Sequence, residues 1–263
     1  DLVQHYAITT TDGSDFVVTD INTTSGAGDD GTDQLTETEG MITSSFTGDF
    51  TGPAVGGVLR MTSGNDIAVG YGSNVTADYT GAVTGTTGIT VNLSQGDSGV
   101  AVSTGQSGTD LFRNIFNITG SEFNDSITGN AQDNILSGGA GNDTLDGGLD
   151  GSSFGDTVDY SGASGAVNVN LTTGISQDGE GGTDALLGIE YVRGSQFDDH
   201  LIGNGVQNWF HGLGGADTLD GSGGSDVVFY EGDVGAVTVD LNAGTAIDGT
   251  GNTDILISIE NAH

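Results

Sequence analysis

Single apolar residues recur every nine positions in two parts of the chain, residues 120–148 and 194–222. In the first part these positions are Ile127, Leu136 and Leu145, and the neighbours of Ile127 and Leu145 are polar. An isolated apolar side chain between polar ones is typical of a three-residue strand whose middle side chain alone faces a core. The spacing therefore predicts a stack of short strands, and no helical periodicity of useful length accompanies it.

A longer alternation of apolar and polar residues follows each of these parts. Residues 166–171 (AVNVNL) and 236–241 (AVTVDL) are 70 positions apart, and residues 89–93 (ITVNL) form an earlier copy. Such an alternation predicts a strand with one buried face. We expect these strand blocks to be longer rungs that continue the same stack.

Each nine-residue unit begins with Gly and carries Asp or Asn at its sixth position, and the whole pattern returns after 74 residues. A fixed period of this kind indicates a repeat architecture. Glycines at the first, second and fourth positions predict a tight turn with positive φ. The sixth-position carboxylate and the inward carbonyls of that turn are the hard oxygen ligands that Ca²⁺ prefers. We expect the carboxylates on the outside of a narrow solenoid and the aliphatic side chains inside it.

The unit at residues 138–146, Gly-Gly-Ala-Gly-Asn-Asp-Thr-Leu-Asp, resembles the calcium-binding RTX (hemolysin-type) nonapeptide repeat, with consensus G-G-x-G-x-D-x-(aliphatic)-x, at every constrained position. Residues 221–229 miss only the second Gly, whereas Asn134 and Asn208 stand where the family has Asp. The clear matches cover about a quarter of the chain. The resemblance implies an all-β fold, a parallel β-roll or β-solenoid with Ca²⁺ between successive turns on each side, in a secreted bacterial protein.

The candidate metal ligands follow from their position in the units. Turn preference alone does not explain why the aspartates keep register with a Gly-rich bend and an inward aliphatic residue. Asp156 follows a four-residue insertion, so we expect its turn to be distorted. The expected carboxylate ligands are Asp125, Asp143, Asp156, Asp199, Asp217 and Asp226, and the expected carbonyl ligands are those of Gly138, Gly139, Gly141, Gly212 and Gly215.

The charge of the chain points to cations as partners. It has 37 acidic residues against three Arg and no Lys, for a formal net charge of −34. A chain of this charge repels itself, and its 49 Gly add backbone entropy that ordering must overcome. Nucleic acid and anionic membrane surfaces need basic footprints, which Arg60, Arg113 and Arg193 do not form. No apolar run approaches the ~20 residues of a membrane span, so we expect no membrane insertion.

Other chemistry is weakly indicated. His200 and His211 have no zinc-type spacing and are expected at the surface. No nucleophile elbow, phosphate loop or metalloprotease motif is present, and no pair of carboxylates stands out for glycoside hydrolysis, so we expect no enzyme activity. Trp209 precedes the inward-facing Phe210. Its indole either faces outward, where it could bind a sugar ring or a neighbouring copy of the protein, or packs against an adjacent loop.

The units and strand blocks divide the chain into four parts. Residues 1–56 form an irregular β-rich segment that includes an acidic run at 29–33, expected to be a solvated loop rather than a calcium loop. Residues 57–119 carry degenerate repeats and a strand block, and residues 120–193 and 194–263 each carry nonapeptides followed by a strand block. The last copy stops in mid-repeat, so we expect the natural protein to continue beyond it.

Three functions are compatible with this pattern. The first is a non-catalytic, calcium-dependent structural module of a large secreted or cell-surface protein, such as an adhesin, a surface-layer protein or an extracellular filament, that folds on Ca²⁺ binding after export. The second is the calcium-binding tail of a secreted protease, lipase or polysaccharide-modifying enzyme. The third is a module that binds a surface glycan.

Overall fold

The computed structural model describes residues 6–10, 16–20, 34–35, 40–42, 49–51, 57–61, 67–69, 75–80, 87–94, 100–101, 110–148, 155–232 and 234–263. Strands, turns and bends make up this part of the chain, and no helix occurs in it. It therefore contains no helix long and apolar enough to cross a membrane. The acidic run 29–33 lies outside the described residues.

The strands belong to three sheets. One contains, in spatial order, β1 (Tyr6–Thr10), β2 (Phe16–Asp20), β4 (Gly40–Ile42), β6 (Gly57–Arg60), β8 (Val75–Asp78), β12 (Asn117–Thr119), β14 (Ile135–Ser137), β16 (Thr157–Asp159), β20 (Tyr191–Arg193), β22 (Trp209–His211), β24 (Val227–Val228) and β28 (Asn261–Ala262). The second contains β10 (Val100–Ala101), β11 (Asp110–Arg113), β7 (Ile67–Val69), β5 (Asp49–Thr51) and β3 (Gln34–Leu35). The third contains β25 (Thr238–Asp240), β26 (Thr245–Ile247), β27 (Thr253–Ile257), β23 (Thr218–Asp220), β21 (His200–Ile202), β17 (Asn168–Asn170), β18 (Ile175–Gln177), β19 (Thr183–Leu187), β15 (Thr144–Asp146), β13 (Ser126–Thr128) and β9 (Thr90–Asn92).

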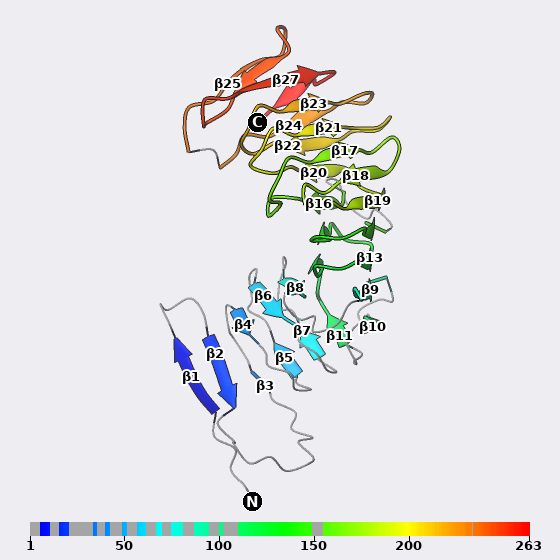
Figure 1. Ribbon diagram of the computed structural model, residues 1–263, viewed down its shortest axis with the longest axis vertical. Coiled ribbons are helices and arrows are strands. Elements are labelled where there is room, and N and C mark those ends of the chain that lie inside the picture. Colours follow the sequence, from blue (N-terminus) through cyan, green and yellow to red (C-terminus); the bar gives the residue numbers. More distant parts are fainter. Residues whose placement is uncertain are drawn as a thin grey trace, which may run out of the picture.

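Successive nine-residue units alternate between the first and the third sheet, which stack their strands along the long axis of the molecule (Figure 1). Strand β12 pairs in parallel with β14, and β13 pairs in parallel with β15. Each strand therefore pairs with the strand two units later, so two units make one full turn. The architecture is the predicted all-β parallel β-roll.

The middle residue of each short strand fills the core. Ile127, Leu136, Leu145, Leu201 and Leu219 are completely buried, and their flanking residues are more exposed. Complete burial of one such aliphatic side chain contributes roughly 1.5–3 kcal/mol relative to exposure. The nine-residue apolar period is thus the signature of the core, as predicted.

The strand blocks differ from the expectation of simple longer rungs. Strand β17 pairs in parallel with β21, and β19 pairs in parallel with β15, but β18 lies antiparallel between β17 and β19. The chain reverses because Gly174, with φ 67°, closes a tight turn in which its N–H donates to the carbonyl of Asn170. The second block repeats this meander in β25, β26 and β27.

Strands of the first 56 residues join the sheets of the later units. Strand β4 pairs in parallel with β6, and β5 pairs in parallel with β7, whereas β1 and β2 form an antiparallel pair. Strand pairing therefore crosses the predicted boundary at residue 56, and the four-part division stays a prediction.

Candidate metal centre

The sixth-position aspartates lie between successive turns of the roll. The predicted carboxylate ligands Asp125, Asp143, Asp156, Asp199, Asp217 and Asp226 are all at most 3% exposed. This corrects the expectation that the carboxylates line the outside of the solenoid. The physical reason is a set of hydrogen bonds that draws each carboxylate toward the backbone of the preceding turn.

These hydrogen bonds form two ladders, one on each side of the roll, which we call the carboxylate ladders. In each rung the backbone N–H of a sixth-position residue donates to the carboxylate at the corresponding position of the next turn. One ladder contains the bonds from Asp125 to Asp143 (2.8 Å), Asp143 to Asp184 (3.0 Å), Asp199 to Asp217 (2.8 Å) and Asp217 to Asp254 (3.0 Å). The other contains the bonds from Asn134 to Asp156 (2.8 Å), Asp156 to Glu190 (3.0 Å), Asn208 to Asp226 (2.7 Å) and Asp226 to Glu260 (2.8 Å).

The second carboxylate oxygen divides the ladder aspartates into two kinds. Asp143 Oδ2 and Asp226 Oδ2 are buried and have no hydrogen-bond donor among the described residues. Asp125 Oδ2 instead accepts the N–H of Ser121 at 2.6 Å, and Asp199 Oδ2 accepts that of Ser195 at 2.5 Å. Burying a carboxylate oxygen without a hydrogen-bond donor is energetically unfavourable. A cation beside Asp143 and Asp226 would compensate for this.

The first glycine of each unit has no side chain and so leaves space beside the second carboxylate oxygen. We call this space the glycine cradle. A Cβ on Gly138 would lie 2.0 Å from Asp143 Oδ2, and a Cβ on Gly221 would lie 2.3 Å from Asp226 Oδ2 and 2.2 Å from the Ser258 carbonyl oxygen. A carboxylate oxygen and a carbonyl oxygen of the next turn therefore meet where a side chain would otherwise stand. Oxygen donors gathered in this way suit a hard cation such as Ca²⁺.

Backbone carbonyls are needed to complete such a site. Within the described ranges, no three His, Cys, Asp or Glu side chains gather closely enough to hold a metal ion by themselves. The carbonyl oxygen of Gly138 lies 2.3 Å from the position of a Cβ on Gly120, and that of Gly212 lies 3.0 Å from the position of a Cβ on Gly194. Both predicted carbonyls thus face the cradle of the preceding turn.

The other predicted glycines define the bend. Gly139, at position two, has φ 86°, while Gly141 and Gly215, at position four, have φ 128° and 118°. Gly138 and Gly212, at position one, are outside this left-handed region, so they are glycines for space and not for φ as we expected. The assignment of individual carbonyls as ligands stays a prediction.

Asparagine replaces the carboxylate in two units and forms a contact that requires no metal. Asn134 Nδ2 donates to the carbonyl of Phe116 at 2.7 Å, and Asn208 Nδ2 donates to that of Glu190 at 3.3 Å. In these two rungs an amide hydrogen bond joins the turns.

Burial leaves the ladders with poorly compensated negative charge. The pKa of Asp143 and of Asp217 is raised to about 8, mainly by burial and to a smaller extent by neighbouring carboxylates. Burial also raises the pKa of Asp125, Asp199 and Asp226. The ion pairs of the described residues, Arg60 with Asp78 at 3.6 Å and Arg193 with Asp159 at 3.0 Å, lie outside the ladders.

Four ladder residues were missed from the sequence, namely Asp184, Glu190, Asp254 and Glu260. They belong to the strand blocks, where the offset of 70 residues aligns Asp184 with Asp254 and Glu190 with Glu260. This alignment was the available signal. For Asp184 the local motif GEGGTDALL at residues 179–187 was a further signal, although the inserted strand β18 separates it from the earlier nine-residue units.

The expected exposure of His211 is wrong, and Trp209, for which an outward and a packed position were both open, is buried. Trp209 is 8% exposed and His211 is 9% exposed, since all three residues of β22 are buried. The packed alternative for Trp209 is the one observed, so its indole offers no open face to a sugar ring. His200 is exposed, as expected.

The comparisons with known proteins agree with this geometry. The family model of the RTX calcium-binding nonapeptide repeat matches the chain in four copies, over residues 119–154 and 203–234. A search of curated proteins gave no match. The matched stretches contain Asp125, Asp143, Asp217 and Asp226, together with the glycine cradles described above. The chain therefore carries RTX calcium-binding nonapeptide repeats, a family of repeats that bind Ca²⁺ in secreted bacterial proteins.

Proposed function

We propose that this chain is a non-catalytic, calcium-dependent structural module of a large secreted or cell-surface protein of the adhesin, surface-layer or filament type. The observation that carries the proposal is the buried carboxylate ladder. Its aspartates join successive turns through one oxygen, while Asp143 and Asp226 aim the other at glycine cradles. Binding and architecture thus depend on the same side chains.

The proposed mechanism is folding coupled to ion binding. Without Ca²⁺, the buried carboxylates repel one another and the chain, with its formal net charge of −34, favours an extended state. Extracellular calcium sites typically have Kd of ~10⁻⁴–10⁻³ M. An ion present at ten times its Kd stabilises the folded state by about 1.4 kcal/mol per site, so several weak sites add up. The module would remain unfolded at low calcium and fold outside the cell.

Two candidate ligand sets are proposed for these ions. On one side of the roll, Asp125, Asp143, Asp199 and Asp217 provide the carboxylates, and on the other side Asp156 and Asp226 do. Carbonyls of Gly138, Gly139, Gly141, Gly212 and Gly215 complete the coordination. Once bound, Ca²⁺ supplies positive charge between turns; the residues themselves set the spacing of the turns.

Circular dichroism during a calcium titration tests the proposal. The chain is dialysed against EGTA, and its β-sheet signal and hydrodynamic radius are followed as CaCl₂ is added. Folding is expected at millimolar or submillimolar Ca²⁺, with Mg²⁺ at equal concentration much less effective because it demands a smaller octahedral site. A chain that is equally β-rich and compact in EGTA would contradict the proposed mechanism.

A further inference from the structure

Residues 179–187, which comprise β19 and the loop before it, form a further nine-residue unit. This unit lies outside the stretches matched by the family model. Strand pairing places Ala185 opposite Thr144, and the N–H of Asp143 donates to Asp184 Oδ1 at 3.0 Å. Asp184 therefore holds the sixth position of a unit at residues 179–187, whose sequence GEGGTDALL misses only the second Gly of the consensus.

The carboxylate of Asp184 in this unit already accepts hydrogen bonds from two side chains. Asp184 Oδ2 accepts the hydroxyl of Tyr160 at 2.8 Å and that of Ser176 at 3.1 Å. Hydroxyl donors thus occupy the oxygen that faces a cradle in a regular unit. A cation between this unit and the preceding turn needs another carboxylate.

Asp178, which directly precedes the unit, has a carboxylate oxygen that could bind a cation. It is 1% exposed, and its Oδ1 accepts the N–H groups of Glu180 and Gly182, both at 2.8 Å. These two bonds fix the carboxylate in place. Its Oδ2 is buried and has no hydrogen-bond donor among the described residues.

A backbone carbonyl of the preceding turn faces the same point. A Cβ on Gly182 would lie 1.6 Å from the carbonyl oxygen of Gly141 and 2.5 Å from Asp178 Oδ2. Asp143, whose own Oδ2 has no donor among the described residues, is close enough to interact electrostatically with Asp178. The Asp178 carboxylate and the Gly141 carbonyl thus meet between the turn at 138–146 and the loop at 178–182, and Asp143 is a further carboxylate in the neighbourhood.

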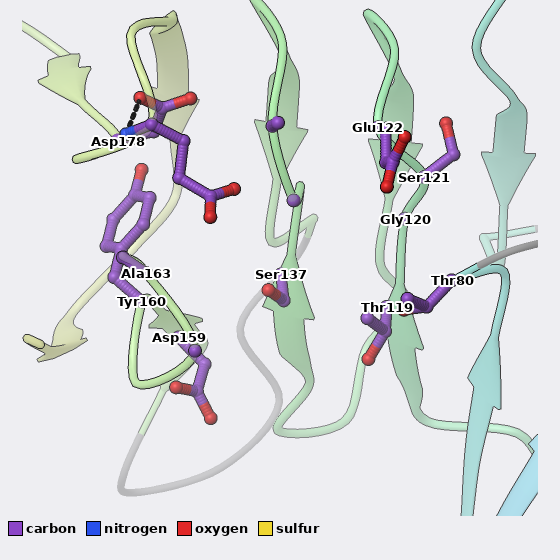
Figure 2. A pocket seen from close by; sticks show the side chains of 14 residues that line it. Thr80, Thr119, Gly120, Ser121, Glu122, Ser137, Asp159, Tyr160, Ala163 and Asp178 are labelled. Atoms are coloured by element: carbon purple, nitrogen blue, oxygen red, sulfur yellow. Dashed lines mark hydrogen bonds between the residues drawn. The ribbon is translucent and has the colours of Figure 1, made fainter. Parts of the chain in front are cut away.

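Asp178 also lines a pocket at the surface of the roll. The pocket has a volume of about 320 Å³, and its acidic lining includes Asp178, Glu180 and Glu122. Figure 2 shows Asp178 and Tyr160 on one side of it and Ser121 and Glu122 on the other.

The second strand block provides an internal comparison. Asp248 corresponds to Asp178, and its Oδ1 likewise accepts the N–H groups of Thr250 and Asn252. Its Oδ2, however, accepts the Thr250 hydroxyl at 2.8 Å. Glu180 stands at the place of Thr250 in the first block and has no hydroxyl to donate. The two blocks therefore differ in the one oxygen that could bind an ion.

We propose that Asp178 Oδ2, the Gly141 carbonyl and Asp143 hold a divalent cation between the turn at 138–146 and the loop at 178–182, and that the corresponding place at Asp248 holds none. The inference rests on the proposed calcium-dependent function. It adds a ligand from outside the nonapeptide units and joins the strand block to the repeats through an ion.

Counting bound ions by native mass spectrometry, with calcium affinities from calorimetry, tests this assignment. Asp178→Asn is expected to bind one Ca²⁺ fewer per chain than the wild type, and the matched variant Asp248→Asn is expected to bind the wild-type number. Glu180→Thr, which introduces the hydroxyl found at Thr250, is expected to lower the affinity of one site at least tenfold.

The outcomes separate the two proposals. If the wild type binds no Ca²⁺, the proposed function itself fails. If the wild type binds Ca²⁺ but Asp178→Asn keeps the full count and affinities, only the Asp178 site is overturned. Should Asp178→Asn fail to fold in calcium, Glu180→Thr decides: an unchanged count with unchanged affinities overturns the site.

Discussion

The backbone N–H of Asp125 donates a 2.8 Å hydrogen bond to Oδ1 of Asp143, 18 residues later in the chain. The donor and the acceptor hold the same position in consecutive turns on one side of the roll. Asp143 Oδ2 faces the cradle of Gly138. One carboxylate thus joins two turns and presents an oxygen to a cation, so its replacement affects the fold differently with and without metal.

Replacing Asp143 by Asn should have opposite effects in calcium and in chelator. In calcium the variant loses one ion, which at 100 times Kd corresponds to about 2.7 kcal/mol of stabilisation. In EGTA it should be at least as stable as the wild type, because a buried charge has been removed. Thermal unfolding in calcium and the folded fraction in EGTA, both followed by circular dichroism, measure this.

Asp133→Asn is the matched control for this variant, since it removes an exposed charge next to a ladder position. It is expected to change the unfolding temperature little in either buffer. If Asp143→Asn were destabilising to the same extent in calcium and in EGTA, the role of Asp143 would be a hydrogen bond alone.

The metal-free chain should become less stable as pH rises. The pKa values of Asp143 and Asp217 are about 8 in the folded state because of burial, whereas unfolded aspartates titrate near ~3.9. A raised folded pKa means that the folded state binds protons more tightly. Its stabilisation is complete below about pH 4 and is lost as pH rises through about 8. The folded fraction in EGTA, followed by circular dichroism, should therefore fall between pH 5 and pH 9.

Calcium should weaken or reverse this dependence. Coordination needs ionised carboxylates, so protons compete with Ca²⁺ and its affinity should rise with pH over the same range. A calcium affinity that does not change between pH 6 and pH 9 would contradict the raised pKa values.

Substituting Gly138 by Ala tests the cradle directly. The added Cβ would lie 2.0 Å from Asp143 Oδ2, so either the carboxylate or the backbone must move, and the bound ion should be lost. Gly205→Ala is the control, because a Cβ there meets no atom of the described residues within 4 Å. The control should keep the wild-type number of ions in native mass spectrometry, and a full ion count for Gly138→Ala would refute the cradle.

The sequence predicted the elements whose signal is periodic. The aliphatic residue at the eighth position of each unit, such as Leu136 or Leu219, identified both the short strand and its inward side, because a slip of one residue would turn it away from the core. The sixth-position aspartates were found for the same reason.

What the sequence did not show depends on side-chain contacts between distant segments. Nothing in the pattern of β22 distinguishes a buried Trp209 from an exposed one, since its flanking position is polar in some units and apolar in others. The burial of the ladder carboxylates also followed from hydrogen bonds between residues 18 or more positions apart, which a local period does not reveal.

Tyr160→Phe should destabilise the protein equally with and without calcium. Its hydroxyl donates to Asp184 Oδ2 at 2.8 Å in a buried contact that contains no metal position, and Tyr230 makes the same contact with Asp254. Loss of a donor to a buried carboxylate costs about 1–3 kcal/mol. Urea unfolding in calcium and the folded fraction in EGTA check this, and an effect confined to calcium would show that the tyrosine acts through an ion.

Asn208→Asp should create a binding site where the chain now uses an amide. Asn208 Oδ1 lies 2.4 Å from the position of a Cβ on Gly203, and the Gly221 carbonyl oxygen lies 2.7 Å from it, as in the aspartate units. The amide donates to the Glu190 carbonyl at 3.3 Å. A carboxylate cannot make this bond and would repel that carbonyl, unless a cation lies between them.

The variant is therefore expected to bind one additional Ca²⁺ per chain and to unfold at a higher temperature in calcium. In EGTA it should be destabilised by about 1–3 kcal/mol, because the amide bond is lost and a charge is buried. Gln207→Glu adds the same charge at the neighbouring exposed position and should gain no ion. If Asn208→Asp gained none either, a sixth-position carboxylate beside a glycine cradle would not be sufficient to bind calcium in this roll.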